Sequence, residues 1–183
     1  MISSNDIVAS GLHPFDQNEL RYWCPWSRSQ SDKRKTDPRD RRTSPCVGRP
    51  AMCISRSSSL QVVTEWLWSR GISCDYSRDL IAARMQVLAD PSQWSMLLLA
   101  IDDFGGFSAV AEDLRALRQM VPKLAVIVVT GESSGDFGSD SSLVFGDATL
   151  RLPIDSEIIG VALSMAAVNS RRWFERMLSL GVV

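Results

Sequence analysis

The sequence has little of the side-chain chemistry that most enzymes use. Its 183 residues include one histidine, His13, and four cysteines, none of them in a C-x-x-C pair. A structural zinc site needs a tighter cluster of His and Cys, and Ser–His catalysis needs a histidine base beside the serine. We therefore expect no metal, no cofactor and no catalytic residues, and ordinary reduced thiols at the four cysteines.

Long hydrophobic runs and strong charge are also missing. No apolar run approaches the roughly 20 residues of a membrane span, and the N-terminal segment lacks the basic and apolar regions of a secretory signal. The formal net charge is −1, which favours neither nucleic acid nor a membrane surface. These features predict a cytoplasmic protein that does not bind a membrane.

Residues 1–50 differ in composition from the rest of the chain. They hold nine Lys/Arg and six Asp/Glu, a formal +3, whereas residues 51–183 carry a formal −4. Between Ser27 and Pro50 there is almost no apolar side chain, so this segment cannot bury enough surface to offset its ordering entropy. We expect residues 1–50 to be a basic, disordered tail and residues 51–183 to be the folded domain.

The folded part alternates strand patterns with helix patterns. Apolar runs predict strands over 51–54, 96–101 and 124–130, a weaker pattern predicts one over 72–76, and a last strand is predicted over 148–152. Helical periodicity predicts helices from Leu60 to before Gly71, from Ser77 or Asp79 to before Pro91, over 107–120 and over 158–177, with a short helix over 140–145. We expect Ser57–Ser59 to cap the first of these helices. Strict alternation with fully apolar strands indicates a parallel sheet with helices on both faces.

The carboxyl ends of the central strands are where such a sheet places a site. Asp102 and Asp103 follow the run 96–101, and Thr130 ends the run 124–130. Two carboxylates are too few for a hard cation, which takes more oxygen ligands. We therefore expect Asp102 and Asp103 to cap the following helix or to face solvent.

Three landmarks in order make residues 50–172 resemble the receiver domain of bacterial two-component response regulators. The stretch LLLA-IDD-FGG has the frame of a receiver's third strand and acceptor loop, with Gly105 in the glycine place. VIVVTG supplies Thr130 and Gly131, and Leu152-Pro153 stands where the family has Lys-Pro. The resemblance implies a flavodoxin-like, doubly wound, five-stranded parallel sheet.

The same resemblance implies that the phosphorylation chemistry has been lost. The family's phosphoacceptor aspartate falls at Ala100, and its lysine falls at Leu152. No acid occurs between Asp40 and Glu65, where the family's metal-binding pair should lie, and Lys123 is the only lysine after the tail. Ala100, Asp102, Asp103, Thr130 and Leu152 would form a degenerate phosphoacceptor pocket.

The expected function is that of a pseudo-receiver: a non-catalytic regulator that binds a protein without being phosphorylated. The partner would be a signalling kinase or regulator, or a second copy. The resemblance places the partner face over about 140–172, with Ile158, Val161, Met165 and Val168 as contacts. About 11 residues follow Arg172, too few for a helix-turn-helix.

Two alternatives remain open on sequence alone. A flavodoxin-like domain could bind a small ligand, or act as an enzyme, at the loops after Ile101 and Thr130. The basic tail could bind nucleic acid, although acids interrupt its basic run, which makes nucleic acid the less favoured partner.

Overall fold

Five parallel strands form one sheet in the computed structural model, which describes residues 48–131 and 144–182. The elements in chain order are β1 (Ala51–Ile54), α2 (Gln61–Trp68), β2 (Cys74–Ser77), α3 (Leu80–Ala89), β3 (Met96–Ala100), α4 (Phe107–Met120), β4 (Ala125–Thr130), β5 (Ala148–Arg151) and α5 (Ser156–Ser179). Short 3-10 turns occupy Pro91–Gln93 and Ile101–Phe104. The strand order is β2-β1-β3-β4-β5, and every neighbouring pair is parallel. The expected doubly wound, flavodoxin-like sheet is confirmed.

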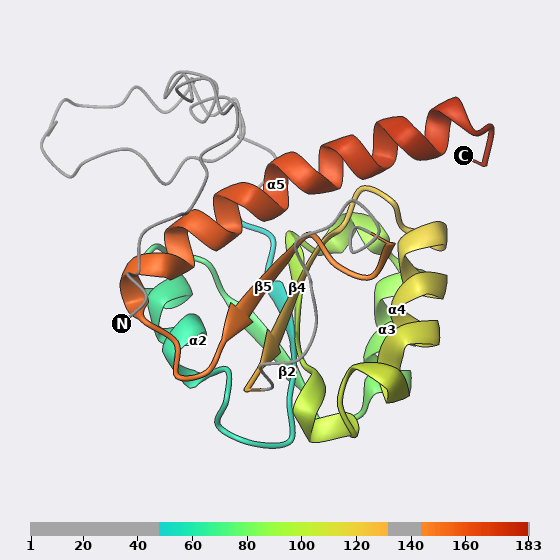
Figure 1. Ribbon diagram of the computed structural model, residues 1–183. Helices are drawn as coiled ribbons and strands as arrows, with labels where there is room; N and C mark the ends of the chain where they lie inside the picture. Colours follow the sequence, from blue (N-terminus) through green and yellow to red (C-terminus); the bar gives the residue numbers. More distant parts are fainter. Residues whose placement is uncertain (1–47, 132–143, 183) are drawn as a thin grey trace, which may run out of the picture.

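Helices cover both faces of the sheet, as Figure 1 shows. On one face, α2 and α5 pack over a core that includes Leu67, Leu98, Ile127 and Leu163. On the other face, α3 and α4 pack over a second core that contains side chains such as Leu99. Because β1, β3 and β4 are buried on both faces, their sequences are continuous apolar runs rather than alternating ones.

Most element boundaries agree with the sequence predictions, and the first helix cap does not. The α4 helix matches its predicted bounds, and Asp79 caps α3 by accepting hydrogen bonds from the backbone of Ile81 and Ala82. The prediction that Ser57–Ser59 cap α2 is wrong, because the N-cap is Leu60 and no side chain bonds to the helix start. Of these serines, Ser57 bonds to a different partner, described below.

Several predictions fall outside the described residues. These are the disordered tail, apart from its last three residues, and most of the short helix predicted over 140–145. Of the four cysteines, Cys53 and Cys74 are described, and both are free thiols.

α5 is attached to the rest of the fold by hydrogen bonds to the two residues of a buried ion pair. The Arg118 guanidinium of α4 donates to both carboxylate oxygens of Asp147, at 2.5 and 2.7 Å. The Trp173 indole of α5 donates to the Arg118 carbonyl at 3.0 Å, and Asn169 of α5 donates to the Asp147 carbonyl at 2.7 Å. The 24-residue α5 is thereby held along its second half. Neither α5 nor any other helix within the described ranges is apolar and long enough to cross a membrane.

Candidate functional site

The carboxyl edge of the sheet brings the five predicted site residues into one region. Ala100 ends β3, and Asp102 and Asp103 lie in the 3-10 turn that follows it. Thr130 ends β4, and Leu152 comes directly after β5. The backbone N–H of Leu152 donates to the Thr130 carbonyl at 2.9 Å, which joins the ends of these two strands.

Ala100 contributes a methyl group to the core rather than a reactive group to the edge. It is 2% exposed, is paired with Val129 in β4, and belongs to the core cluster under α2 and α5. The half-buried Leu152 packs against the same cluster.

Asp102 binds to the end of β4. Its Oδ1 accepts a hydrogen bond from the Thr130 hydroxyl at 2.7 Å, and its Oδ2 accepts one from the Gly131 backbone N–H at 2.6 Å. A Cβ at position 131 would lie 3.4 Å from Asp102 Oδ2 and 3.9 Å from the Leu152 Cβ. Two converging donors are therefore already satisfied by a carboxylate of the same chain.

Asp103 binds to the loop after β1. Its Oδ2 accepts from the Ser55 hydroxyl at 2.6 Å, from the Arg56 backbone N–H at 2.8 Å, and from both the N–H and the hydroxyl of Ser57 at 3.1 Å. Partial burial alone would raise the pKa of this carboxyl, but the bonds from Ser55, Ser57 and Arg56 together lower the pKa of Asp103 below its usual range. Asp103 is therefore a charged clamp between two loops.

Arg56 lies beside this clamp. Its guanidinium donates to the Arg78 carbonyl at 3.3 Å and to the Asp103 carbonyl at 3.4 Å, and it sits 4.6 Å from the centre of the Phe104 ring. Where the receiver resemblance would have metal-binding acids, the loop after β1 presents backbone N–H groups, hydroxyls and an arginine. Donors of this kind hold a carboxylate and repel a metal ion.

The prediction that Asp102 and Asp103 cap the next helix is wrong. The N-cap of α4 is Gly106, and no side chain bonds to that helix start. Asp102 is exposed and Asp103 half-buried, but both carboxylates accept hydrogen bonds from neighbouring loops rather than meeting water alone. Sequence reasoning missed Ser55 and Ser57 as partners; the serine cluster directly after β1 was the available signal.

The described residues provide few of the groups that phosphoryl transfer needs. Within the described residues, no Lys or Arg lies within ion-pair distance of Asp102, and no cluster of three or more His, Cys, Asp or Glu side chains could hold a metal ion. Lys123 precedes β4 and so lies at the opposite edge of the sheet. The two aspartates are arranged to hold loops together.

Replacing Asp103 by asparagine is expected to destabilise the fold by about 1–2 kcal/mol at pH 7, because four donors lose a charged acceptor. A carboxyl whose folded pKa is lowered adds stability above its unfolded pKa, and that stability is lost as pH falls through the folded pKa. The deficit should therefore shrink below about pH 4. Urea unfolding at pH 7 and pH 3 measures it, with the exposed Glu112→Gln variant as control. A deficit equal at both pH values would contradict a charged clamp.

Comparison with known proteins shows similarity in fold and little in sequence. No family model matches the chain, and no curated protein matches it. Among solved structures, a CheY-like receiver domain from Methanospirillum hungatei is 14% identical, with TM-score 0.53, over 68% of this chain and 97% of that one. A sensor protein from Polaromonas sp. JS666 is 22% identical, with TM-score 0.53, over 67% and 98% of the two chains.

A beryllofluoride-activated NtrC4 receiver domain dimer is also similar, at 16% identity and TM-score 0.55, over 66% of this chain and 98% of that one. Receiver domains are thus matched over almost their full length. The chain has the receiver fold.

Proposed function

We propose that this chain is a pseudo-receiver that signals by binding a protein partner and is not phosphorylated. The observation that carries this proposal is the hydrogen bonding of Asp102 and Asp103. Both carboxylates at the carboxyl edge are engaged by donors of the chain itself, while the acceptor place of the receiver resemblance is the buried methyl of Ala100.

The arrangement at Thr130 supports a state that needs no added phosphoryl group. A phosphoryl group would offer oxygens to nearby hydroxyl and N–H donors. Here the Thr130 hydroxyl and the Gly131 N–H already bind the Asp102 carboxylate. The Asp102 carboxylate therefore takes the donors that a phosphoryl group would use. It links the turn after β3 to the end of β4 without phosphorylation.

The outer face of α5 supports binding to a protein. Ile158, Val161 and Met165 are large apolar side chains that remain 43%, 61% and 53% exposed, and Val168 beside them is half-buried. Neighbouring exposed apolar side chains of this kind mark interaction surfaces. The partner is a signalling kinase or regulator, or a second copy, and the proposed setting is the cytoplasm.

A ligand-binding or enzymatic role at the same edge has less support. Such a role would need a pocket over Ala100, which is 2% exposed. It would also need a reactive group among Asp102, Asp103 and Thr130, whose side chains are joined to neighbouring strands and loops. We therefore propose a non-catalytic role.

The test is capture of partners from a lysate of the source organism by the immobilised full chain, before and after treatment with acetyl phosphate and Mg²⁺. We expect the same partner in both cases, and its loss with Met165→Asp. Ile81→Asp is the matched control, because Ile81 is similarly exposed, at 61%, on α3 at the other face of the sheet. A partner captured only after phosphodonor treatment would contradict the proposal.

A further inference from the structure

Basic side chains gather at the amino edge of the sheet, the edge opposite the two aspartates. The second half of α5 reaches this edge, because the Ser170 hydroxyl donates to the carbonyl of Lys123, which precedes β4, at 3.1 Å. The Lys123 ammonium lies 4.5 Å from the centre of the Phe174 ring of α5. Arg49 precedes β1 at the same edge. Only β3 lies between β1 and β4, so the starts of these strands are about 10 Å apart.

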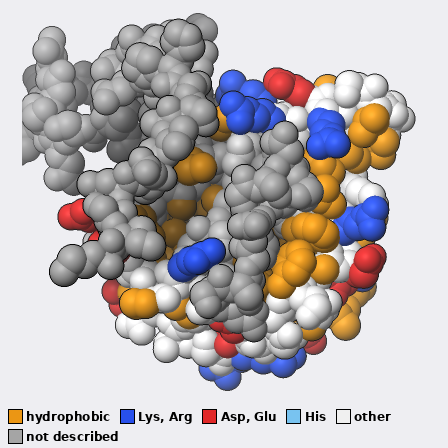
Figure 2. Space-filling view, viewed as in Figure 1, with side chains coloured by type: hydrophobic (Ala, Val, Ile, Leu, Met, Phe, Trp, Pro, Cys, Tyr) orange, Lys and Arg blue, Asp and Glu red, His pale blue; other side chains and the backbone are white. Residues whose placement is uncertain are grey.

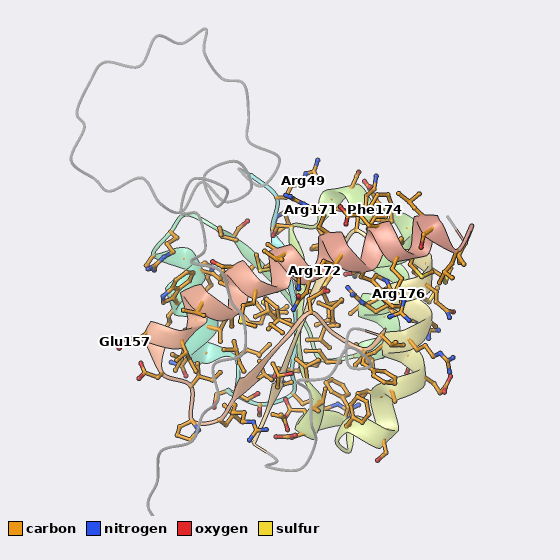
Figure 3. All side chains as sticks on the ribbon, turned by 45° about the horizontal axis from the view of Figure 1, so that its top comes forward. Arg49, Glu157, Arg171, Arg172, Phe174 and Arg176 are labelled. Carbon is orange, nitrogen blue, oxygen red and sulfur yellow. The ribbon has the colours of Figure 1, made fainter. Side chains whose placement is uncertain are left out.

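Three arginines of α5 complete this group. They are exposed and lie within about 7.5 Å along the helix axis. Figure 3 labels them and shows Arg49 beside Arg171. Figure 1 agrees, since the first described residues pass beside α5, and Figure 2 shows Lys and Arg side chains gathered over this half of the helix. We call the five residues together the basic edge: Arg49, Lys123, Arg171, Arg172 and Arg176.

The basic edge concentrates positive charge in a protein whose net charge is −1. All five residues are exposed, and none of them forms an ion pair within the described ranges. Without Lys123, the three arginines and the neighbouring Glu175, residues 51–183 carry a formal −7. The segment that leads into the fold adds to the same end, with eight basic and three acidic residues between Ser27 and Pro50. A separated positive region of this kind attracts an anionic partner.

The chemistry of the basic edge fits a phosphate backbone better than a protein or a membrane. Between Arg171 and Arg176 the exposed side chains are charged, while Trp173 is buried and Phe174 half-buried. A protein interface has an apolar centre, and a membrane-surface helix exposes an apolar face. Nucleic-acid interfaces are more polar and more positively charged. Four of the five cations are arginines, whose planar guanidinium groups match pairs of phosphate oxygens.

We propose that the basic edge binds the phosphate backbone of a nucleic acid, and that the basic segment 27–48 adds further phosphate contacts. This is a second binding surface, separate from the apolar first half of α5, and it goes beyond the protein binding proposed above. Phosphate contacts carry no sequence information. Binding should therefore depend strongly on salt and be indifferent to base sequence.

Fluorescence anisotropy of the full chain with a labelled DNA duplex and a labelled single-stranded RNA, between about 50 and 300 mM NaCl, tests the proposal. We expect micromolar dissociation constants near 100 mM NaCl and a linear fall of log K with log[NaCl]. Each phosphate contact contributes about 0.9 to the slope on a duplex and about 0.7 on a single strand. Arg171→Gln/Arg172→Gln should therefore reduce the duplex slope by about 2 and weaken binding more than about tenfold. The nucleic acid that binds more tightly identifies the natural source of the phosphates.

Arg78→Gln/Arg151→Gln is the matched control, because both arginines are exposed and lie at the carboxyl edge, after β2 and at the end of β5. This variant should bind like wild type. Circular dichroism verifies that each variant keeps its helices.

Three results would overturn the proposal. One is the absence of binding to either nucleic acid at about 100 μM protein and 50 mM NaCl. Another is an Arg171→Gln/Arg172→Gln variant that binds like wild type, because the segment before Arg49 would then bind alone. The third is tighter binding to polyglutamate or to phosphatidylglycerol vesicles than to either nucleic acid; the vesicles are included because Leu178 and Leu180 are exposed beyond Arg176.

Discussion

Replacing Asp147 by asparagine is expected to lower the free energy of unfolding by about 3–5 kcal/mol. Asp147 is 2% exposed and Arg118 is 0% exposed, and the two are joined by two hydrogen bonds. The Asp147 carboxylate also accepts from the Val126 backbone N–H at 2.7 Å. Without the carboxylate, the buried guanidinium loses both of these hydrogen bonds and the negative charge that they come from.

Burying the Arg118–Asp147 pair costs free energy of desolvation, although removing one partner from the buried pair would also destabilise the fold. Burial raises the pKa of Asp147, to about 6, and lowers that of Arg118, although each ion favours the charged form of the other. Desolvation therefore offsets much of the attraction. We expect the double variant Arg118→Met/Asp147→Asn to be more stable than Asp147→Asn alone, because it also removes the buried guanidinium that has lost the Asp147 carboxylate.

Guanidinium chloride unfolding of the wild type, Asp147→Asn and the double variant measures these differences in the free energy of unfolding. Arg84→Met is the matched control: Arg84 bonds to Asp113 in a pair whose side chains are both 33% exposed, so its loss should change stability by less than about 1 kcal/mol. Equal effects of Asp147→Asn and Arg84→Met would show that Arg118 is less buried than the structure indicates.

Restoring a carboxylate at the acceptor place, with Ala100→Asp, is expected to destabilise the domain by about 1–3 kcal/mol at pH 7.5. Ala100 lies in the core beneath α2 and α5, and Lys123 is at the opposite edge of the sheet. Burial should raise the pKa of the introduced carboxyl. A carboxyl whose folded pKa is raised destabilises most above that pKa, so the loss should shrink between pH 7.5 and pH 5.

Urea unfolding at both pH values, each compared with wild type at the same pH, measures this effect. Ala100→Asn is the control, because it has the same shape without the charge and should give a loss independent of pH. An Ala100→Asp variant that is as stable as wild type at both pH values, or that gains stability with Mg²⁺, would contradict this expectation. It would show an open, polar pocket that can still bind a metal ion.

The strands and helices could be predicted because each is encoded by its own residues. The run 125–129 is apolar throughout and buried throughout, and the helix at 107–120 repeats apolar residues on one side. The strand predicted over 96–101 ends one residue early, at Ala100, because Ile101 begins the 3-10 turn that turns the chain toward α4.

The contacts of the candidate site could not be predicted in the same way. Ser55 is 48 residues before Asp103, and Thr130 is 28 residues after Asp102. The local sequence shows that a carboxylate follows a strand, and capping of the next helix is the local interaction that this pattern predicts. Which distant donors take that carboxylate depends on the order of strands in the sheet, where β3 lies between β1 and β4.

Intact-mass measurement of the full chain after incubation with acetyl phosphate and Mg²⁺ tests the central claim most directly. A conventional receiver domain treated in parallel verifies that the phosphodonor is active. We expect no change in mass for this chain, because Ala100 has no nucleophile and because Asp102 and Asp103 are held by Thr130, Gly131 and the loop after β1. A stable phosphoryl adduct on Asp102 or Asp103 would contradict the claim that this receiver fold works without phosphorylation.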